Sequence, residues 1–593
     1  MRRAALALVA ALAIPAAAAE PPRDAKLHAL FEREFMWAVE QYPESGTFLG
    51  LPGYDDKVTD FSPQAIAVRK ARVKRLMADL GRFDPKRLNT QDRISRDLML
   101  HNLAMMEEEN ALYGDLPFGT GPDGWMQVSS MHGPQNFLTQ LVQSTRFAAP
   151  VDYENYLKRL DKVPRALDQM MELMRAGLRS GWVPPRDAMS KVPAMFTVFA
   201  GTDVTASPLW QPFADYPAAI PAADRERFTA AGRTTLSAKV HPAFAKWKRF
   251  LEEEYLPGCA RELAASKLPA GERYYAHLVR EQTTTNLAPE RIHEIGLAEV
   301  KRIRAEMDAV IAKTGFKGTF AEFLHFIRTD PRFFFKTGEE RLRAYRDLAK
   351  RADAELPKLF AELPRVPYGV RAMKEFEGDN SDHYSSPALD GSRSGYFEAN
   401  VNNLQNRPSH EMEATLLHEA VPGHHLQTAR SLELTGLPKF RRSSWYGAYG
   451  EGWALYAESL GFDMGFYTDP YSHFGRLSAE MLRACRLVID TGLHAKGWTR
   501  AQSIAYLAEN SGVAKDYAEA EIDRYIVWAG QALSYKIGEM KIRELREKAR
   551  GALGARFDIR RFHNAVLDDG AVPLTVLEAR IDEWIAAEKG RKS

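Results

Sequence analysis

The sequence predicts a mainly α-helical protein with one small β-sheet. Apolar residues recur with helical spacing in long segments spread over most of the 593 residues. Strand-like patterning is confined to residues 366–401, where Asp390 and Gly391 are the expected turn. A chain of this length buries about three quarters of its unfolded surface. It therefore needs no disulfide framework, and we expect Cys259 and Cys485 to remain unpaired.

The expected helices follow one another along the whole chain. In chain order they cover residues 26–41, 63–80, 90–113, 152–180, 223–256, 289–314, 338–363, 411–432, 445–465, 472–493, 514–537 and 574–589. Asp152 is expected to open one of these helices, and Thr499 with Gln502 has the spacing of a capping box. The proline- and glycine-rich stretches at 117–133 and 208–221 are expected loops between helices.

The N-terminus has the three parts of a secretory signal peptide, which we assign to residues 1–19. Arg2 and Arg3 precede an apolar core, and residues 17–19 fit an A-x-A cleavage site. The core is too short to span a bilayer, and no later run of about 18 apolar residues follows. Removing the two arginines takes the formal charge from +2 to 0, so no basic field suggests a nucleic-acid partner. We expect the mature protein in the periplasm of a Gram-negative bacterium, or secreted.

Residues 418–427 read HEAVPGHHLQ and carry the strongest chemical signal in the chain. A His-Glu pair followed by a further histidine is typical of zinc hydrolases, in which two imidazoles hold the metal. His418 is the first candidate ligand. Glu419, which follows it directly, is the candidate general base that takes a proton from the water at the metal.

The second ligand is less direct, because Pro422 and Gly423 interrupt the H-E-x-x-H spacing. On an unbroken helix His424 would point about 240° away from His418. Proline removes a backbone donor and glycine permits unusual dihedral angles, so we expect this pair to bulge the helix and re-aim the next histidine. His424 is the expected ligand, and His425 is the alternative. A helix that stops at Pro-Gly, with solvated histidines, is the interpretation without a metal.

A third protein ligand is expected from the segment EGWALYAE, residues 451–458. Glu451 follows His424 by 27 residues (451 − 424) and is the preferred candidate. Glu458 lies two helical turns further along and faces the same way. It is the alternative ligand, or else it hydrogen-bonds a ligand histidine from behind.

The helix expected at 472–493 carries a charged stripe near its end. Arg486, Asp490 and His494 are spaced i, i+4 and i+8 and share one helix face. Because burying unpaired charge is costly, this stripe needs partners. In the catalytic interpretation Asp490 orients His494, which donates a hydrogen bond to the developing oxyanion. In the structural interpretation Arg486 and Asp490 form an ion pair, and His494 is a helix-end group.

The helix expected at 514–537 carries a second polar stripe. Arg524, Trp528, Gln531 and Tyr535 are spaced i, i+4, i+7 and i+11, which places them on one side of a continuous helix. A tyrosine hydroxyl suits stabilisation of a tetrahedral oxyanion. Arg524 could bind a substrate's terminal carboxylate, with Gln531 as a second substrate-binding residue. In the structural alternative, Arg524 pairs with a buried carboxylate while Gln531 and Tyr535 are structural hydrogen-bonding groups.

Four motifs in the C-terminal half occur together in a known family. They read, in order, HEAVPGHH, EGWALYAE, DTGLHAKGWT and RYIVWAGQALSYKIG. This run resembles domain of unknown function 885, a large bacterial family that is grouped with the zincin-like metallopeptidases. The resemblance covers most of the mature chain and is strongest from Asp382 to Gly538. Ala529 departs from it, because the family is expected to have proline there.

The resemblance implies a large helical zincin-like metallopeptidase fold with a small β-sheet near the metal helix. The spacing of His424 and Glu451 also resembles that of helical gluzincins such as the angiotensin-converting enzyme, thimet oligopeptidase and carboxypeptidase Taq families. The order of motifs in these families favours the catalytic interpretation of His494. We divide the chain into an N-terminal helical region (20–265) and a C-terminal zincin-like catalytic region (266–593), with one continuous domain as the alternative.

The sequence therefore predicts a periplasmic zinc peptidase that hydrolyses short peptides. Zn²⁺ would be held by two histidines and a glutamate, with Glu419 as general base and Tyr535 and His494 as oxyanion donors. A carboxypeptidase or dipeptidase mode would follow if Arg524 reaches the C-terminal carboxylate. One alternative is a zinc amidohydrolase or esterase that acts on a non-peptide cell-wall substrate. The other is a non-catalytic helical periplasmic binding protein with a degenerate site.

Overall fold

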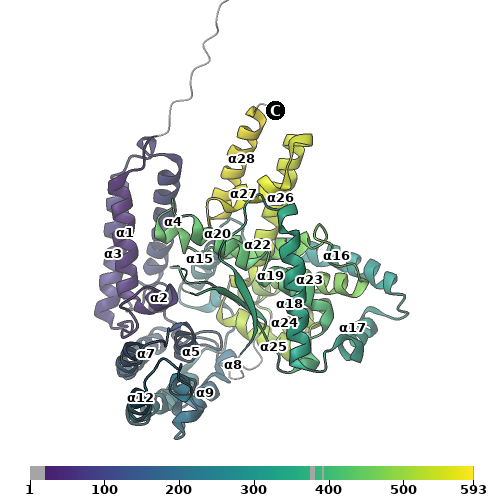
Figure 1. Ribbon diagram of the computed structural model, residues 1–593. Helices are drawn as coiled ribbons and strands as arrows, with labels where there is room; N and C mark the ends of the chain where they lie inside the picture. The colour runs from purple at the N-terminus through teal and green to yellow at the C-terminus, as the bar shows by residue number, and fades with distance from the viewer. Residues whose placement is uncertain (1–20, 374–380, 390, 392, 592–593) are drawn as a thin grey trace, which may run out of the picture.

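The computed structural model describes residues 21–373, 381–389, 391 and 393–591. Within these ranges the protein is mainly α-helical, as predicted, and it contains one three-stranded sheet (Figure 1). The expected signal peptide and Asp390 of the expected turn lie outside the described residues. None of the described helices has the length and apolar character needed to cross a membrane.

The N-terminal part of the chain forms helices joined by short loops, 3-10 turns and two π-helical segments, Leu236–Val240 and Leu251–Tyr255. The bounds are α1 (Ala25–Gln41), α2 (Pro43–Phe48), α3 (Pro63–Gly81), α4 (Thr90–Tyr113), α5 (Pro134–Ser144), α6 (Pro150–Leu160), α7 (Val163–Ser180), α8 (Arg186–Met189), α9 (Val192–Met195), α10 (Thr197–Ala200), α11 (Gln211–Ala214), α12 (Ala222–Thr235), α13 (His241–Phe250), α14 (Leu256–Gly258) and α15 (Gly271–Thr283). The helix expected at 152–180 is therefore two helices. Asp152 lies inside the first turn of α6, where its carboxylate accepts the backbone N–H groups of Ala148 and Ala149, because Pro150 already begins the helix.

The C-terminal part contains the longest helices. The bounds are α16 (Pro289–Thr314), α17 (Phe320–Thr329), α18 (Gly338–Glu355), α19 (Met412–Glu419), α20 (His424–Glu433), α21 (Lys439–Arg442), α22 (Gly447–Leu460), α23 (Pro470–Lys496), α24 (Arg500–Ser511), α25 (Lys515–Val527), α26 (Ser534–Leu553), α27 (Ile559–Leu567) and α28 (Leu574–Gly590). The expected capping box of Thr499 and Gln502 is confirmed at the start of α24. The continuous helix expected at 514–537 is wrong, because the chain leaves helical geometry after Val527 and Gly530 has a φ of +84°.

The small sheet lies in the middle of the molecule, as Figure 1 shows. Its strands are β1 (Tyr368–Ala372), β2 (His383–Ser385) and β3 (Gly395–Ala399), in the order β1-β3-β2. β3 is parallel to β1 and antiparallel to β2, and the side chains of Phe397 and Ala399 are fully buried. The sheet expected within residues 366–401 is therefore confirmed, and β3 contacts α20.

The core consists of several hydrophobic clusters. One gathers aromatic residues of the N-terminal helices, including Trp182 and Trp247. A second surrounds Trp453 on α22, and a third lies between α16 and α23. These last two helices pack closely, since a Cβ added at Gly296 would lie 2.8 Å from Cγ2 of Val488. The division of the chain near residue 265 stays a prediction.

Candidate metal centre

The three side chains preferred as metal ligands come together in the structure: His418, His424 and Glu451. Their candidate ligand atoms all lie within 4.8 Å of one another. Oε2 of Glu451 lies 3.4 Å from Nε2 of His424 and 3.7 Å from Nε2 of His418. Two ligand atoms of a tetrahedral zinc ion, with bonds of about 2.0–2.1 Å, are roughly 3.3 Å apart. Two imidazole nitrogens and a carboxylate oxygen at this spacing therefore fit a zinc ion.

A break between α19 and α20 aims the two histidines at each other. The break holds a cis Val421–Pro422 peptide, and the carbonyl oxygen of Pro422 accepts the indole N–H of Trp453 at 2.8 Å. A Cβ added at Gly423 would lie 1.9 Å from the carbonyl oxygen of His418, so only glycine fits there. The bulge expected at this proline and glycine is confirmed, and it is large enough to separate two helices.

The side chain of His425, the alternative ligand, lies on the face of α20 that is turned toward the sheet. Its Nε2 lies 3.1 Å from the carbonyl oxygen of Val366, and its Nδ1 lies 3.0 Å from the hydroxyl of Tyr384. Because a carbonyl can only accept, Nε2 carries the proton and Nδ1 accepts from the tyrosine. Burial lowers the pKa of His425 to about 4, so the ring is neutral. Both nitrogens are occupied, which leaves His424 as the histidine available to a metal.

Glu458 lies behind His418 rather than among the candidate ligands. Its Oε1 is 2.8 Å from Nδ1 of His418, and both side chains are buried. The carboxylate holds the proton on Nδ1 and directs Nε2 toward Glu451. Burial opposes the charged imidazole, but hydrogen bonds with Glu451 and Glu458 raise the pKa of His418 to about 9, so a metal bound at Nε2 would replace a proton there. Of the two roles expected for Glu458, the geometry matches the one behind the ligand.

Glu419 is the last residue of α19 and is half-buried next to His418. Across the described ranges it makes no hydrogen bond and no ion pair, so its carboxylate can accept a proton from a small molecule.

Trp445, which sequence patterning did not single out, borders the site beside His424. Its ring centroid is 5.8 Å from that of His424, and 54% of the residue is exposed. The indole therefore forms part of the surface that a substrate would meet.

Tyr535 lies in the first turn of α26, with its ring nearly parallel to that of His418 at a centroid distance of 6.4 Å. The guanidinium carbon of Arg486 lies 4.4 Å from the centre of the tyrosine ring. Burial, followed by the charge of Glu451, raises the pKa of Tyr535. The hydroxyl therefore stays protonated at neutral pH and can donate a hydrogen bond.

Most residues of the polar stripe expected around Tyr535 come together, but they do not lie on one continuous helix. Trp528 lies in the loop after α25 and is 43% exposed. Nη1 of Arg524 donates to Oε1 of Gln531 at 2.7 Å, and Nε2 of Gln531 donates to the hydroxyl of Tyr535 at 3.3 Å. Three of the four residues therefore form a chain of hydrogen bonds across the loop, and Trp528 points elsewhere.

Arg524 makes hydrogen bonds with Glu521 and Gln531 within the protein. Its Nε and Nη2 donate to the carboxylate of Glu521 at 3.1 and 3.0 Å, and Arg486 donates to the same carboxylate at 2.8 Å. The ion pair considered between Arg486 and Asp490 is therefore replaced by one with Glu521. Sequence reasoning missed Glu521, although its position three residues before Arg524 on a helix is the spacing of an ion pair. Three of the five N–H groups of Arg524 are therefore used in hydrogen bonds within the protein.

Asp490 and His494 are not brought to the metal ligands. The carboxylate of Asp490 accepts the hydroxyl of Tyr275 at 2.8 Å and the backbone N–H of Gly530 at 2.9 Å. Nδ1 of His494 accepts the backbone N–H of Ala265, and its Nε2 donates to a backbone carbonyl on α25. His494 is 0% exposed and has no N–H left for an oxyanion. Asp490 instead ties the loop that contains Gln531 to α23.

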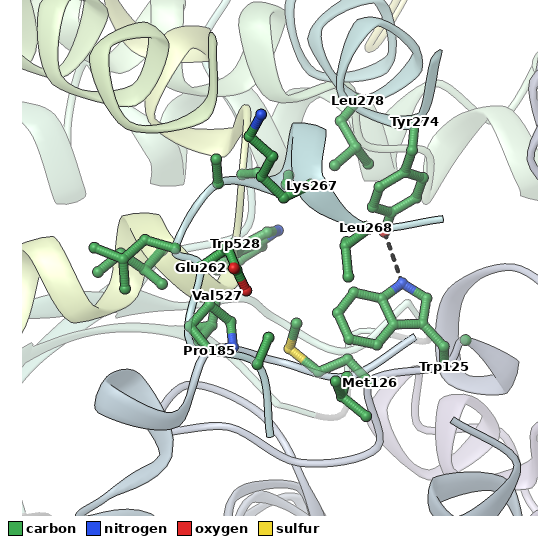
Figure 2. Close-up of a pocket in the computed structure, with 18 of the residues that line it drawn as sticks. Trp125, Met126, Pro185, Glu262, Lys267, Leu268, Tyr274, Leu278, Val527 and Trp528 are labelled. Atoms are coloured by element: carbon green, nitrogen blue, oxygen red, sulfur yellow. Dashed lines mark hydrogen bonds between the residues drawn. The ribbon is translucent and has the colours of Figure 1, made fainter. Parts of the chain in front are cut away.

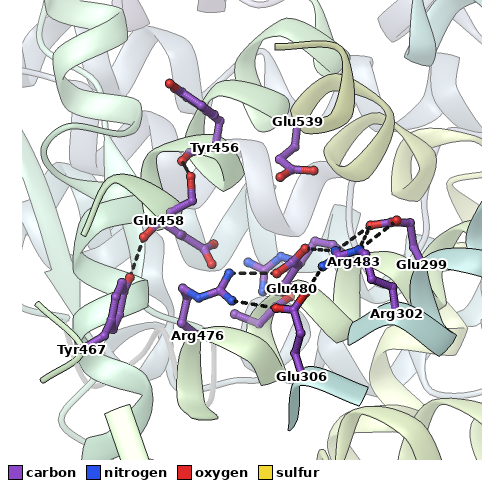
Figure 3. A network of polar contacts seen from close by, with 12 residues as sticks. Glu299, Arg302, Glu306, Tyr456, Glu458, Tyr467, Arg476, Glu480, Arg483 and Glu539 are labelled. Carbon is purple, nitrogen blue, oxygen red and sulfur yellow. Dashed lines mark hydrogen bonds and ion pairs between the residues drawn. The ribbon is translucent and has the colours of Figure 1, made fainter. Parts of the chain in front are cut away.

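A buried network of charges lies behind the site and joins α16, α23 and α26. The ammonium of Lys536, the residue after Tyr535, lies 3.0 Å from Glu299, 2.8 Å from Glu480 and 2.9 Å from Glu539. Figure 3 shows that Arg302 and Arg476 approach the carboxylates of Glu299, Glu306 and Glu480 in the same layer. These ion pairs fix the start of α26, and with it Tyr535, against the neighbouring helices.

The fold and the residues at its centre define a mainly helical protein with a His₂Glu cluster. The family model described as "Bacterial protein of unknown function (DUF885)" matches residues 43–581. The chain therefore belongs to this family. A comparison with curated protein sequences gives no match.

Two solved structures are similar to the whole chain. One is the crystal structure of a lipoprotein candidate from Colwellia psychrerythraea, with 28% identity and a TM-score of 0.89 over 95% of this chain and 99% of the other. The second is the structure of a lipoprotein candidate of unknown function from Shewanella oneidensis, with 18% identity and a TM-score of 0.67 over 93% of this chain and 99% of the other. The second likeness concerns the fold alone.

Proposed function

We propose that this protein is a zinc-dependent peptidase that hydrolyses short peptides, with the helical fold of the zincin-like metallopeptidases. The observation that carries the proposal is the convergence of His418, His424 and Glu451 from three different helices. The proton on Nδ1 of His418, held by Glu458, supports the same reading because ligand histidines in zinc sites are commonly oriented in this way. A bound zinc ion would supply Lewis-acid polarisation of a carbonyl and activation of water.

The protein's own side chains supply the rest of the chemistry. Glu419 accepts a proton from the attacking water and passes it to the leaving amine. Tyr535 donates its hydroxyl hydrogen bond to the carbonyl oxygen as negative charge builds there. Gln531 and Arg524 hold that hydroxyl in place through their chain of hydrogen bonds. His494 and Asp490 have no role in this mechanism, because their side chains are hydrogen-bonded to other residues of the fold.

The site favours short substrates over folded proteins, because its ligands lie within the helical shell. His418 and His424 are 3% and 9% exposed. A carboxypeptidase or dipeptidase mode depended on Arg524, and this residue is hydrogen-bonded to Glu521 and Gln531. The proposal therefore does not include such a mode.

We also propose that the mature protein is exported to the periplasm or secreted. The signal-like N-terminus and the similarity to the lipoprotein candidate from Colwellia psychrerythraea support this.

The experiment that tests the function combines metal analysis with hydrolysis. The purified mature protein should contain about one zinc per chain and should cleave members of a short-peptide library. Glu419→Gln should keep the zinc and lose at least about 10²-fold in turnover, the scale of a general base. Cleavage of cell-wall amides or esters without peptide cleavage would replace the peptidase by the amidohydrolase alternative. A protein without metal or hydrolysis would instead be a binding protein.

A further inference from the structure

A cavity of about 300 Å³ lies between the N-terminal helices and the loop that follows α25. It is formed by the end of α4, the loops at 121–126 and 260–268, the helix α15, and residues 526–529 at the end of α25 and just after it. Small-molecule sites in proteins occupy about 300–1,000 Å³, so this cavity has room for one side chain or a small ligand. None of the metal ligands lines it.

The walls of the cavity are largely aromatic and apolar. Figure 2 shows Trp125 and Tyr274 on one side, with the indole N–H donating to the tyrosine hydroxyl at 3.1 Å. Met126 and Leu268 extend this surface, and Trp528 closes the opposite side. Aromatic faces of this kind attract cations as well as apolar groups.

The charges in the cavity are mainly negative. Glu109, Glu262 and Glu281 line it, and Lys267 is the single lysine or arginine among the lining residues. Glu262 makes no hydrogen bond or ion pair with any described residue, and Figure 2 shows its carboxylate pointing into the cavity. The Lys267 side chain extends away from it. One oxygen of Glu109 accepts the hydroxyl of Tyr113, and the other has no hydrogen bond within the described ranges.

The cavity borders two elements that also reach the metal centre. Trp528 precedes, in the same loop, Gln531, which bonds Tyr535. Gln282, a lining residue, packs against the start of α22, the helix that carries Glu451. A Cβ added at Gly447 there would lie 3.2 Å from Oε1 of Gln282. A substrate at the metal could therefore extend one of its residues into the cavity.

We propose that this cavity is a recognition subsite for a basic side chain, a guanidinium or ammonium group, on the peptide substrate; this rests on the function proposed above. A cation would pair with Glu262 and lie against the faces of Trp125 and Trp528. Glu262 is an exposed residue, so an apolar group placed there would cover a solvated carboxylate without giving it a partner. An anionic group would face three carboxylates.

The subsite also makes binding depend on pH through Glu109. Burial raises the pKa of this carboxyl to about 7, so it is partly protonated at neutral pH. A bound cation favours the ionised form, and affinity for the cation should therefore rise between pH 6 and pH 8. The other titratable groups that line the cavity are Tyr113, His132, Glu262, Lys267, Tyr274 and Glu281.

The test uses two isosteric probes, Nα-acetyl-arginine amide and its neutral counterpart Nα-acetyl-citrulline amide. Binding is measured by calorimetry on the full-length protein carrying Glu419→Gln, so that turnover does not interfere. The arginine probe should bind about fivefold more tightly than the citrulline probe, since citrulline loses the ion pair with the exposed carboxylate of Glu262. Adding Glu262→Gln should remove most of this difference. Glu272→Gln, an exposed residue of α15 outside the cavity, should leave it unchanged.

Equal affinity for the two probes would overturn the subsite, and so would a preference that survives both Glu262→Gln and Glu109→Gln. These outcomes are separate from those of the proposed function. Peptide hydrolysis without a preference for basic residues would leave the peptidase and remove the subsite. A clear preference for the arginine probe in a protein that never hydrolyses a peptide would leave the subsite and remove the peptidase.

Discussion

Oε1 of Glu458 lies 2.8 Å from Nδ1 of His418, on the side of the ring away from Glu451. This contact selects the tautomer whose Nε2 can bind a metal. Glu458→Gln keeps the shape of the side chain but removes its charge, so zinc affinity should fall by about 10–100-fold. Competition with a chelator of known affinity measures the change. Glu544→Gln, exposed on α26, is the control, and an unchanged affinity in Glu458→Gln would contradict the role.

The two neighbouring histidines of α20 should behave differently on replacement. His424→Ala should lose the bound zinc, because it removes one of three ligands. His425→Ala should keep about one zinc per chain but lower thermal stability, because it removes the contacts with Val366 and Tyr384. Elemental analysis with a thermal unfolding curve separates these results. The reverse pattern would mean that the break at Pro422 aims the other histidine.

Tyr535→Phe should lower kcat by about 10²–10³-fold with little change in KM, as expected when one oxyanion donor is lost. The reason is that the hydroxyl bonds the carbonyl oxygen only as charge develops. Gln531→Leu should give a smaller loss of kcat, since it frees the hydroxyl without removing it. Steady-state kinetics on one cleaved peptide measures both. A rise in KM alone for Tyr535→Phe would make the tyrosine a substrate-binding residue.

Local sequence signals predicted most of the helices and the sheet, but not the path of the chain between them. The spacing of Arg524, Gln531 and Tyr535 was interpreted on one continuous helix, whereas the contact is made across a loop that starts after Val527. That loop is held by the bond between Asp490 and the backbone of Gly530, which joins residues far apart in sequence. No periodicity within a window of one helix contains this information.

The candidate metal centre was easier to predict than the groups around it. Ligand chemistry restricts the residue types, and the pair Pro422–Gly423 marked where the helix must break. The sequence could not separate His424 from His425, because the choice depends on Tyr384 and a backbone carbonyl of the sheet. It likewise left two interpretations of His494 open, because its two partners are backbone groups that carry no sequence signature.

Lys536 should matter for stability more than its single charge suggests. It is 1% exposed and contacts three carboxylates, so Lys536→Met would leave them buried without their shared cation. Breaking a buried ion network by removing one partner costs about 3–5 kcal/mol. Urea unfolding followed by circular dichroism should show the loss. Lys541→Met, on the same helix but half-buried, should cost about 1 kcal/mol or less. An equal effect of the two changes would contradict this account of the network.

The close approach of α22 and α26 gives the sharpest test of how the fold builds the site. A Cβ added at Gly538 would lie 1.8 Å from the carbonyl oxygen of Ala448, and one at Gly452 would lie 2.5 Å from Cα of Gly538. Gly538→Ala must therefore push the two helices apart, at a cost of about 1–3 kcal/mol. Because α22 carries Glu451 and α26 carries Tyr535, zinc affinity and kcat should fall together with stability.

Gly551→Ala is the matched control on α26, because an added Cβ there meets no atom within 4 Å. It should stabilise the protein by about 0.4–1 kcal/mol, since alanine lowers the conformational entropy of the unfolded chain. Both variants are compared by urea unfolding, zinc titration and kinetics on one peptide. If Gly538→Ala lowered stability but left zinc affinity and kcat unchanged, the helix contact would serve the core alone. The break at Pro422 and the contact with Glu458 would then hold the metal site without help from the contact between α22 and α26.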